Sequence, residues 1–278
     1  MKRTHHPLRM ALGPYLPILL IVLFAIGPYL WTFISSITPE TDLYRAEFRF
    51  FPEHPTGENY TRLFTKLDFT SNILDSLLVA LFTALLGLGI TVPASYSFSR
   101  FKFKGRNPLL MQFLIINMFP IMLLIVPLFV MMRVVGIMDT HFALIIAYST
   151  FTIPFSTWML TSFFNAIPID LDKAAQIDGC SRIGALVRII IPVAMPGIVS
   201  TGIYIFITAW NEYLYAAILT SSKIRTIPIA LQNMIGEFRI EWGLLTAGGI
   251  ISALPVIILF FFIQKQLITG MTAGAVKG

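Results

Sequence analysis

The chain has 278 residues, of which 56% are hydrophobic and only 12% are charged, and its mean hydropathy is +0.79. A soluble domain of this length carries about a quarter charged residues, so the composition excludes a water-soluble globule. The net charge is +6, and the single cysteine, Cys180, excludes an intrachain disulfide and a multi-cysteine metal site.

The chain begins with a basic arm, Met1–Met10, that precedes a long apolar run. This run is too long for the core of a signal peptide, so it predicts a signal anchor with a first transmembrane helix at Tyr15–Ser36. His5 and His6 lie in the basic arm, and we expect them to be solvated rather than to bind a metal.

Five further apolar runs predict transmembrane helices, because a bilayer span needs ~20 mostly apolar residues. Most of them contain proline or glycine, which membrane helices tolerate where neighbouring helices satisfy the freed backbone groups. The sequence therefore predicts an all-α polytopic membrane protein with six transmembrane helices, in one domain over residues 1–278 with core helices at 73–268. The five runs are Ile73–Phe98, Pro108–Met132, Phe142–Phe164, Pro196–Leu219 and Leu244–Ile263.

The distribution of Lys and Arg predicts that both termini are cytoplasmic. Twelve of the twenty basic residues lie in the N-terminal arm, Ser99–Asn107, Asn165–Ile191 and the tail from Gln264. Ser99–Asn107 weighs most in this prediction, because a nine-residue joint with four cations resists translocation.

The predicted cytoplasmic segment Asn165–Pro192 contains the pattern of a short helix. Asp170 is a good N-cap, and Asp172 suits the positive end of the helix dipole. Gly179 is predicted to end this helix in a left-handed conformation, and Ser181 to cap a second short helix.

Both short helices are predicted to be amphipathic. Such helices could lie on the lipid surface, but the first presents alanines and has no Trp or Phe, which favours docking into a groove of another protein. The apolar positions at helical spacing are Leu171, Ala174 and Ala175 in the first helix and Ile183, Leu186, Val187 and Ile190 in the second.

The spacing of Ala174-Ala175, Gly179, Ile189 and Pro192 resembles the EAA motif of ABC-importer permeases, which docks on the nucleotide-binding subunits. The motif's leading Glu is replaced by Lys173, which removes a possible capping box with the predicted N-cap. The resemblance implies that the following residues couple the chain to an ATPase: Asp170, Asp172, Lys173, Ala174, Ala175, Asp178, Gly179, Ile189 and Pro192.

Other segments resemble the maltose-type subfamily of these permeases: Tyr96–Phe101 with Gly105-Arg106, Gly136–Thr140, Trp210–Tyr213 and Gly270–Gly278. The resemblance implies the fold of a type I ABC importer permease in the cytoplasmic membrane of a bacterium or archaeon. It also implies a carbohydrate importer that contains a second, non-identical permease, two ATPase subunits and an extracytoplasmic sugar-binding protein, with membrane lipid around it and no nucleic acid.

The chain contains no Gly-Lys dipeptide and hence no Walker A phosphate loop. We therefore expect no enzymatic activity, no catalytic residue, no metal site and no cofactor in this chain, with ATP and Mg²⁺ bound by the partner ATPase. The alternative is a stand-alone ion-coupled secondary carrier, which would place charged residues within the membrane. Asp75 and Glu212 are the acids nearest the predicted spans, and both lie toward outer ends.

Sugars are bound by hydrogen-bonding groups and by aromatic stacking. Candidates for the substrate pathway are therefore Trp210, Asn211, Glu212, Tyr213 and Tyr215. Trp and Tyr near helix ends can instead serve as interface anchors. A maltose-type or trehalose-type sugar is implied by the resemblance to the subfamily.

The predicted external segment Ser221–Gly243 is much longer than the about 2–8 residues that join most helices. We predict that it contacts the sugar-binding protein, with Gln232, Asn233 and Met234 as the candidate residues. In the alternative, the segment folds back on the protein's own external surface.

Overall fold

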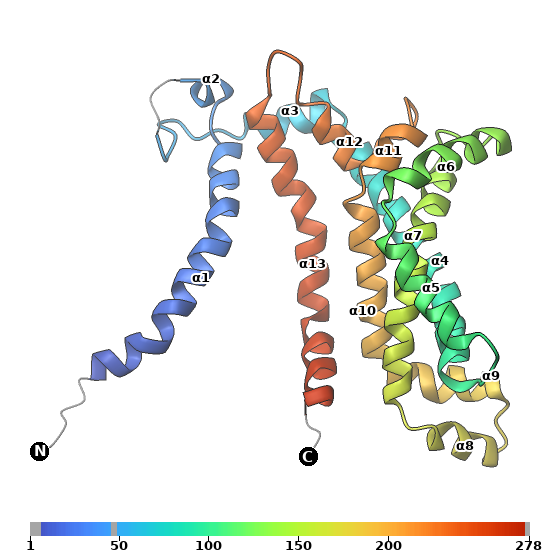
Figure 1. Ribbon diagram of the computed structural model, residues 1–278. Helices are drawn as coiled ribbons and strands as arrows, with labels where there is room; N and C mark the ends of the chain where they lie inside the picture. Colours follow the sequence, from blue (N-terminus) through green and yellow to red (C-terminus); the bar gives the residue numbers. More distant parts are fainter. Residues whose placement is uncertain (1–6, 46–48, 276–278) are drawn as a thin grey trace, which may run out of the picture. The chain divides into compact units, whose positions relative to one another are not determined.

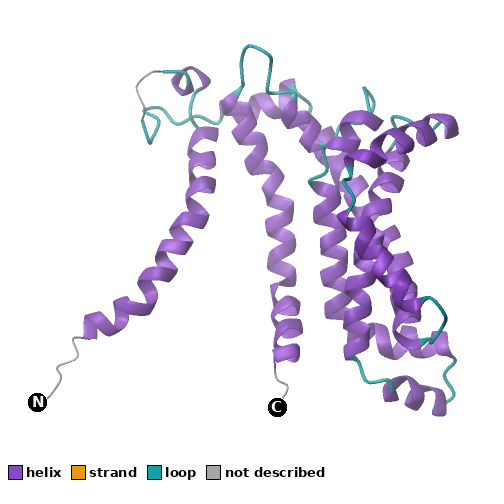
Figure 2. Cartoon of the chain, in the orientation of Figure 1, coloured by secondary structure: helices purple, strands orange, loops and turns teal. Residues whose placement is uncertain are grey.

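Figures 1 and 2 show the computed structural model, which describes residues 7–45 and 49–275. Within those ranges the regular structure is helical, apart from an isolated antiparallel bridge between Ile235 and Ile240. The predictions for His5, for His6 and for the end of the C-terminal motif from Val276 onward fall outside the described residues.

The helices follow one another along the described chain with these bounds: α1 Pro7–Ser36, α2 Glu40–Leu43, α3 Glu58–Lys66, α4 Phe69–Arg100, α5 Arg106–Met118, α6 Met122–Val135, α7 His141–Ala166, α8 Asp170–Ile177, α9 Arg182–Ala185, the π-helical turn η1 Leu186–Ile190, α10 Ile191–Trp210, α11 Leu214–Leu219, α12 Ile227–Gln232 and α13 Trp242–Ala275.

Five helical stretches in the described residues are long and apolar enough to cross a membrane, and the bent pair α5–α6 makes a sixth if it forms one span. The first stretch, Tyr15–Ser36, lies within α1, which begins at Pro7 and ends at the predicted Ser36. The second, fourth and sixth predicted spans lie mainly within α4, α7 and α13. The prediction of an all-α polytopic membrane protein is therefore confirmed.

The third predicted span, Pro108–Met132, is not one continuous helix. It is divided into α5 and α6, whose axes differ by 97°. Phe119 has an extended backbone, with φ −72° and ψ 135°, because the ring of Pro120 disfavours the helical conformation of the residue before it. The apolar pattern predicted the membrane segment correctly but could not reveal this break.

The fifth predicted span, Pro196–Leu219, is shifted along the chain. The helical stretch runs through α9, η1 and α10, from Arg182 to Trp210. The predicted second short helix is present as α9, and η1 joins it to α10 without a break. The π-helical turn precedes Pro192, which lacks an N–H and would clash with the carbonyl four residues before it in a regular helix.

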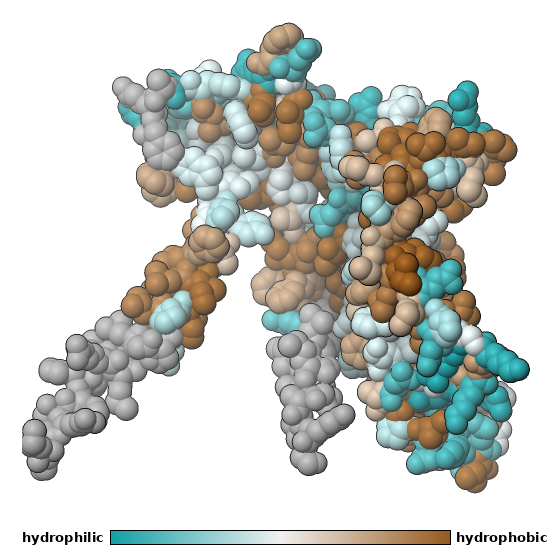
Figure 3. Space-filling view, viewed as in Figure 1, coloured by the Kyte–Doolittle hydropathy of each residue, from teal (hydrophilic) through white to brown (hydrophobic). Residues whose placement is uncertain are grey.

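The chain forms two compact units, which we describe separately. The first contains the chain up to Phe69 together with Leu231–Leu254, and the second contains residues 70–230 and the chain from Pro255 onward. The expectation of a single membrane domain stays a prediction. In Figure 3, hydrophilic side chains gather in the second unit at the end that holds α8 and α9, here called the α8 end. The opposite end of this unit, which holds α11, is called the α11 end.

In the first unit, Asn59 of α3 fixes the end of α1. Its buried side-chain amide donates to the carbonyl oxygens of Ser36 and Thr38, at 2.9 Å each. The hydroxyls of Ser36 and Tyr60 lie 2.7 Å apart in a hydrogen bond. These bonds satisfy carbonyls at the end of α1 that have no partner within the helix.

In the second unit, α7 is the central helix and packs against α5 and α10. Its buried residues occupy nearly every turn from Ala143 to Phe164. The approach of α10 is close because Gly197 faces Phe163, and a Cβ added at Gly197 would lie 2.6–2.9 Å from the Cβ, Cγ and Cδ1 atoms of that phenylalanine.

Gly197→Ala is therefore expected to destabilise the α7–α10 contact by about 1–3 kcal/mol, the usual cost of overpacking a dense interior. The matched control is Gly89→Ala in α4, where an added Cβ meets no atom within 4 Å. Thermal unfolding in detergent should give a lower Tm for Gly197→Ala than for Gly89→Ala, and equal values would contradict the close contact.

Candidate functional site

The C-terminal end of α8 is closed by Gly179, as the sequence predicts. Gly179 has a φ of +85°. Its N–H donates to the carbonyl oxygen of Gln176 at 3.1 Å, and the N–H of Cys180 donates to that of Ala175 at 2.9 Å. These two bonds form a Schellman motif, in which glycine is favoured because φ is positive. The predicted cap of the following helix is also confirmed, since the Ser181 hydroxyl accepts the N–H of Gly184.

The start of α8 differs from the prediction. Asp170 is the first helical residue and not the N-cap, which is Ile169 without a side-chain acceptor. The turn already begins at Pro168, whose carbonyl accepts the N–H of Leu171 at 3.3 Å. Asp170 instead pairs with Lys173, Oδ1 to Nζ 2.9 Å, and the hydrogen bond from that ammonium lowers the pKa of the Asp170 carboxyl. A capping box between Asp170 and residue 173 therefore cannot form, because Asp170 is not the N-cap.

The face that α8 buries also differs from the prediction. Asp172 and Ala175 are buried, at 4% and 1% exposure, whereas Leu171 and Ala174 are exposed. The spacing of apolar residues predicted the wrong buried face of α8, because the charged side chain of Asp172 points into the protein.

Asp172 is buried because α4 supplies two partners for its carboxylate. Arg100 Nε lies 2.8 Å from Asp172 Oδ2, and the side chains of this ion pair are 7% and 6% exposed. The Tyr96 hydroxyl donates to Asp172 Oδ1 at 2.7 Å. A buried charge is tolerated only when it is paired and hydrogen-bonded, and both conditions are met.

Arg100 also reaches the end of α7. Its two terminal nitrogens donate to the carbonyl oxygens of Phe164 at 3.0 Å and Ile167 at 3.1 Å. The last carbonyls of a helix have no intrahelical partner and attract a cation. One guanidinium thus joins α4, α7 and α8.

An apolar cluster surrounds this polar group. Tyr96 packs edge-on against Phe101 and Phe164, with ring centroids 6.2 Å apart in both pairs. Ile190 of η1 belongs to the same cluster, and Ile189 packs against it. The cluster removes water from the ion pair, which strengthens the attraction and raises the cost of losing either partner.

Sequence reasoning did not assign Tyr96 and Arg100 to this site. Both were noted only as part of a joint between two spans. Their spacing of four residues at the end of a predicted helix could have indicated a shared face. Their partner Asp172 lies 76 residues after Tyr96, and nothing in one sequence indicates that pairing.

The remaining surface of α8 and its neighbours is largely exposed. Asp178 and Pro192, both predicted to couple to the ATPase, are exposed. Ile177 and Ile183 are 85% and 75% exposed at the two sides of the Gly179 turn. The exposed apolar residues of this end, here called the α8 surface, are Ile169, Leu171, Ile177, Ile183 and Val187.

The predicted pathway residues divide into buried and exposed ones. Trp210 is buried and stacks on Phe206 with centroids 5.7 Å apart. Tyr215 is buried as well, and its hydroxyl donates to the carbonyl oxygen of Ile121 at 3.2 Å. Glu212 accepts the N–H groups of Tyr215 and Ala216 and thereby caps α11.

Asn211 and Tyr213 are the pathway candidates that remain exposed. Asn211 donates from its side-chain amide to the carbonyl of Ile207 at 2.9 Å, which leaves its amide oxygen available. The geometry brings the five candidates to the α11 end, but it gives three of them contacts that explain their presence without a substrate.

At the α11 end, Asp139 holds the chain that follows α11. Asp139 has a φ of +58°, and its carboxylate accepts the N–H and hydroxyl of Ser221 and the N–H groups of Ser222, Lys223 and Ile224. Burial opposes ionisation of this carboxyl, but the donors outweigh it and hold the pKa of Asp139 well below its usual range.

A second set of contacts fixes the next residues of the same segment. Asp75 Oδ2 accepts the N–H of Arg225 at 3.0 Å, while Oδ1 lies 2.7 Å from His141 Nε2. The Ser76 hydroxyl accepts the N–H of Ile227 at 2.7 Å. Residues 221–227 are therefore folded back on their own unit. This agrees, for these residues, with the alternative in which the segment folds back on the protein's own surface.

From Leu231 onward, the predicted contact segment lies in the first unit. Gln232 and Asn233 are exposed, whereas Met234 is buried and its carbonyl accepts the N–H of Glu241 at 3.0 Å. Between them the chain forms a tight loop, here called the 235–240 loop. Phe238 in this loop is 95% exposed.

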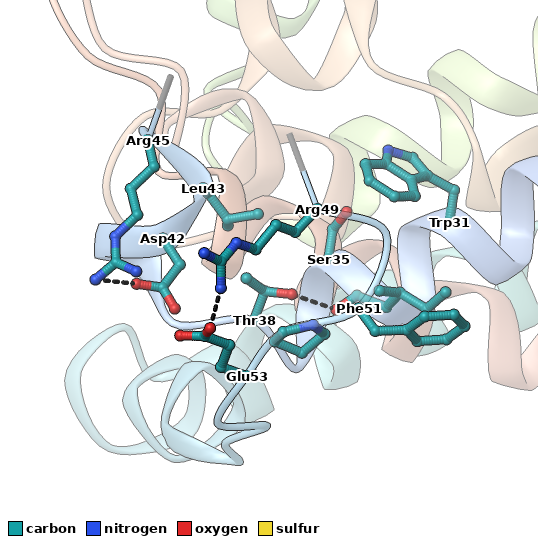
Figure 4. Close-up of a pocket in the computed structure, with 11 residues that line it drawn as sticks. Trp31, Ser35, Thr38, Asp42, Leu43, Arg45, Arg49, Phe51 and Glu53 are labelled. Carbon is teal, nitrogen blue, oxygen red and sulfur yellow. Dashed lines mark hydrogen bonds and ion pairs between the residues drawn. The ribbon is translucent and has the colours of Figure 1, made fainter. Parts of the chain in front are cut away.

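A small pocket of about 110 Å³ lies in the first unit beside the end of α1 (Figure 4). Trp31 and Phe51 line it, and its charged side chains are paired: Arg45 with Asp42 at 3.2 Å, and Arg49 with Glu53. The pocket is smaller than the about 300–1,000 Å³ of most ligand sites, so we assign no ligand to it.

The arrangement defines a class of protein: a polytopic helical membrane protein with a short helix held rigidly at one end of the bundle by a buried ion pair. Residues 84–272 match the family of binding-protein-dependent transport system inner membrane components, and the chain belongs to this family. The resemblance predicted from the sequence is thereby confirmed.

Several characterised relatives are similar over nearly their whole length. The sulfoquinovosyl glycerol transport system permease protein of Agrobacterium fabrum is 36% identical over 90% of this chain and 88% of its own. The trehalose transport system permease protein of Mycobacterium tuberculosis is also 36% identical, over 93% of this chain and 95% of its own. The trehalose/maltose permease protein of Thermococcus litoralis is 34% identical, over 94% of each chain.

A solved structure shares the fold. A chain of a bacterial ABC transporter that imports the acidic polysaccharide alginate superposes with a TM-score of 0.77, at 22% identity, over 96% of this chain and 100% of that one. At this identity the likeness concerns the fold alone. It agrees with the predicted fold of an ABC importer permease.

Gly179→Val is expected to strain the left-handed turn by at least about 1 kcal/mol and to misaim α8. Gly179→Asn is the matched control, because Asn adopts positive φ more readily than a β-branched residue. Cells that carry the Gly179→Val variant should lose uptake of the transported substrate, and cells that carry Gly179→Asn should largely keep it. The two variants are compared at equal amounts of protein in the membrane. Equal uptake by both variants would contradict the role of the turn.

Asp139 is expected to hold residues 221–224 over a wide pH range. Because its pKa is lowered by folding, its contribution is complete above the unfolded value of about 3.9 and is lost as pH falls through the lower folded value. The protection of these amides from hydrogen exchange, relative to the unfolded chain at the same pH, should therefore be high at neutral and mildly acidic pH and should fall only in strong acid.

The variants Asp139→Ala and Asp139→Asn separate the two features of this residue. Asp139→Ala should lower this protection at neutral and mildly acidic pH, because it removes the acceptors and disfavours the positive φ. Asp139→Asn keeps the backbone preference and one acceptor, so it should lower protection less, and its protection should not change in strong acid because asparagine does not titrate. Protection unchanged by Asp139→Ala would contradict the assignment.

Proposed function

We propose that this chain is a transmembrane permease subunit of an ATP-driven carbohydrate importer, forms half of the translocation pathway and is coupled through α8 to a separate ATPase. The observation that carries this proposal is the rigidly held α8 with its exposed α8 surface. Apolar side chains exposed at a polar end of a membrane protein favour a protein partner. Family membership favours this function over a stand-alone ion-coupled carrier.

The substrate class is proposed from the relatives. Those named above are permease proteins for sulfoquinovosyl glycerol, for trehalose, and for trehalose or maltose. We infer that this chain transports an oligosaccharide or disaccharide of maltose or trehalose type. Asn211 and Tyr213 are the pathway candidates best placed to contact it, because their side chains are exposed.

The orientation and the energy source follow from the same proposal. Both termini and α8 lie on the cytoplasmic side, in the inner membrane. The contact of Arg100 with Asp172 supports this orientation, because it brings the two basic segments 99–107 and 165–191 to one side. ATP and Mg²⁺ bind to the ATPase, and this chain contributes no catalytic residue.

The remaining partners are a second, non-identical permease and an extracytoplasmic sugar-binding protein. A solved relative of the same fold was determined in complex with an alginate-bound periplasmic protein, at a TM-score of 0.66. We propose that the 235–240 loop together with Gln232 and Asn233 contacts the sugar-binding protein. The exposed side chain of Phe238 favours a partner at this loop. Met234 is buried and packs beneath the loop instead of contacting a partner.

A reciprocal pair of variants tests the two docking sites. Ile177→Glu places a charge at the α8 surface and should abolish retention of the ATPase subunit in a pull-down, because desolvating an unpaired charge is unfavourable. Phe238→Glu should retain the ATPase but lose the stimulation of ATP hydrolysis by the sugar-loaded binding protein. The chain without its ATPase should show no ATP binding at micromolar concentrations.

Each variant is the control for the other, since both replace an exposed apolar residue by glutamate. The proposal fails if Ile177→Glu retains the ATPase. It also fails if the chain alone transports sugar in liposomes, as an ion-coupled carrier would.

A further inference from the structure

The residues that hold α8 can do more than place it. α8 is joined to α7 by residues 167–169 and to α9 by residues 178–181, which are not helical. Both joints are hydrogen-bonded turns, at Pro168 before α8 and at Gly179 after it. In addition, the side-chain contacts of Asp172 connect α8 to α4, a helix of 32 residues that is distant in the chain.

The contacts are strong enough to make the two helices move together. Arg100 and Asp172 are almost fully buried, and Tyr96 adds a hydrogen bond of 2.7 Å to the same carboxylate. Moving α8 away from α4 would leave a buried guanidinium without its counter-charge, which is strongly unfavourable. A movement of α8 that carries α4 with it avoids this cost.

The chemistry of the pair requires arginine. The guanidinium is a planar fork whose Nε lies beside the Asp172 carboxylate in an ion pair, while its terminal nitrogens donate to the α7 carbonyls. A lysine would carry the same charge but could not occupy these separated acceptors at once. The α7 carbonyls also explain why a carboxylate in place of Arg100 would be repelled.

We infer that Arg100 and Tyr96 are positioning residues that transmit the displacement of α8 to α4, so that α4 carries movement driven by ATP hydrolysis into the translocation pathway. The inference rests on the proposed coupling of α8 to an ATPase. It assigns to these two residues a role in energy transfer, distinct from the docking role of the α8 surface.

The experiment uses the complete importer in liposomes, with transport and ATP hydrolysis measured on the same sample. In the assembled fraction of the Arg100→Lys and Asp172→Asn importers, sugar transported per ATP should fall about tenfold or more, since each variant leaves a buried group poorly paired. The double variant should be no worse than the worse single one, as expected for residues that act as a unit. Arg133→Lys, the same exchange at the exposed end of α6, should leave the ratio unchanged.

Tyr96→Phe keeps the inference testable if both charge variants fail to assemble. It removes one oxygen and keeps the ring contacts, and it should lower transport per ATP about two- to fivefold through the loss of one hydrogen bond to a charge. An assembled variant with an unchanged ratio would overturn the inference and leave the pair as a local structural contact. A wild-type chain that binds no ATPase would instead contradict the proposed function itself.

Discussion

The position of α8 depends on one buried ion pair, Arg100 with Asp172. Taking two charges out of water is unfavourable unless each finds good partners, and here each does: the carboxylate has Tyr96 and Arg100, and the guanidinium has the end of α7 in addition. The pair sets which face of α8 is turned inward. It therefore also decides which side chains are left for a partner, among them Ile177.

The same physical rule governs the α11 end. Asp139, Asp75 and Glu212 lie outside the long apolar stretches or near their ends, and each accepts backbone N–H groups. Within the helices, hydroxyls instead bond the carbonyl four residues earlier, as Thr152 does with Tyr148 and Thr161 with Thr157. Charges thus fix the ends of the bundle, whereas these hydroxyls are satisfied within their own helix.

Two of the predicted spans show where pattern reasoning reached its limit. Apolar runs indicate that a segment is hydrophobic, but the geometry within the run depends on proline. Pro120 divides the third span, and Pro192 follows the π-helical turn in the fifth. Because the hydrophobicity of both segments continues across these points, an apolar window cannot place the break or the start of the helix.

The sequence by itself determined the membrane class, most of the spans, the end of α8 at Gly179, the cap at Ser181 and the family. These features depend on composition, on local spacing and on the conformational freedom of single residues. In each case the residues that interact lie within a few positions of one another in the sequence. The tertiary structure decided that Asp172 is buried, that Trp210 and Tyr215 are packed inside, and that Asp139 holds residues 221–224. Those outcomes depend on contacts between residues such as Tyr96 and Asp172, 76 positions apart, and the energy of such a contact exists only after the helices have packed.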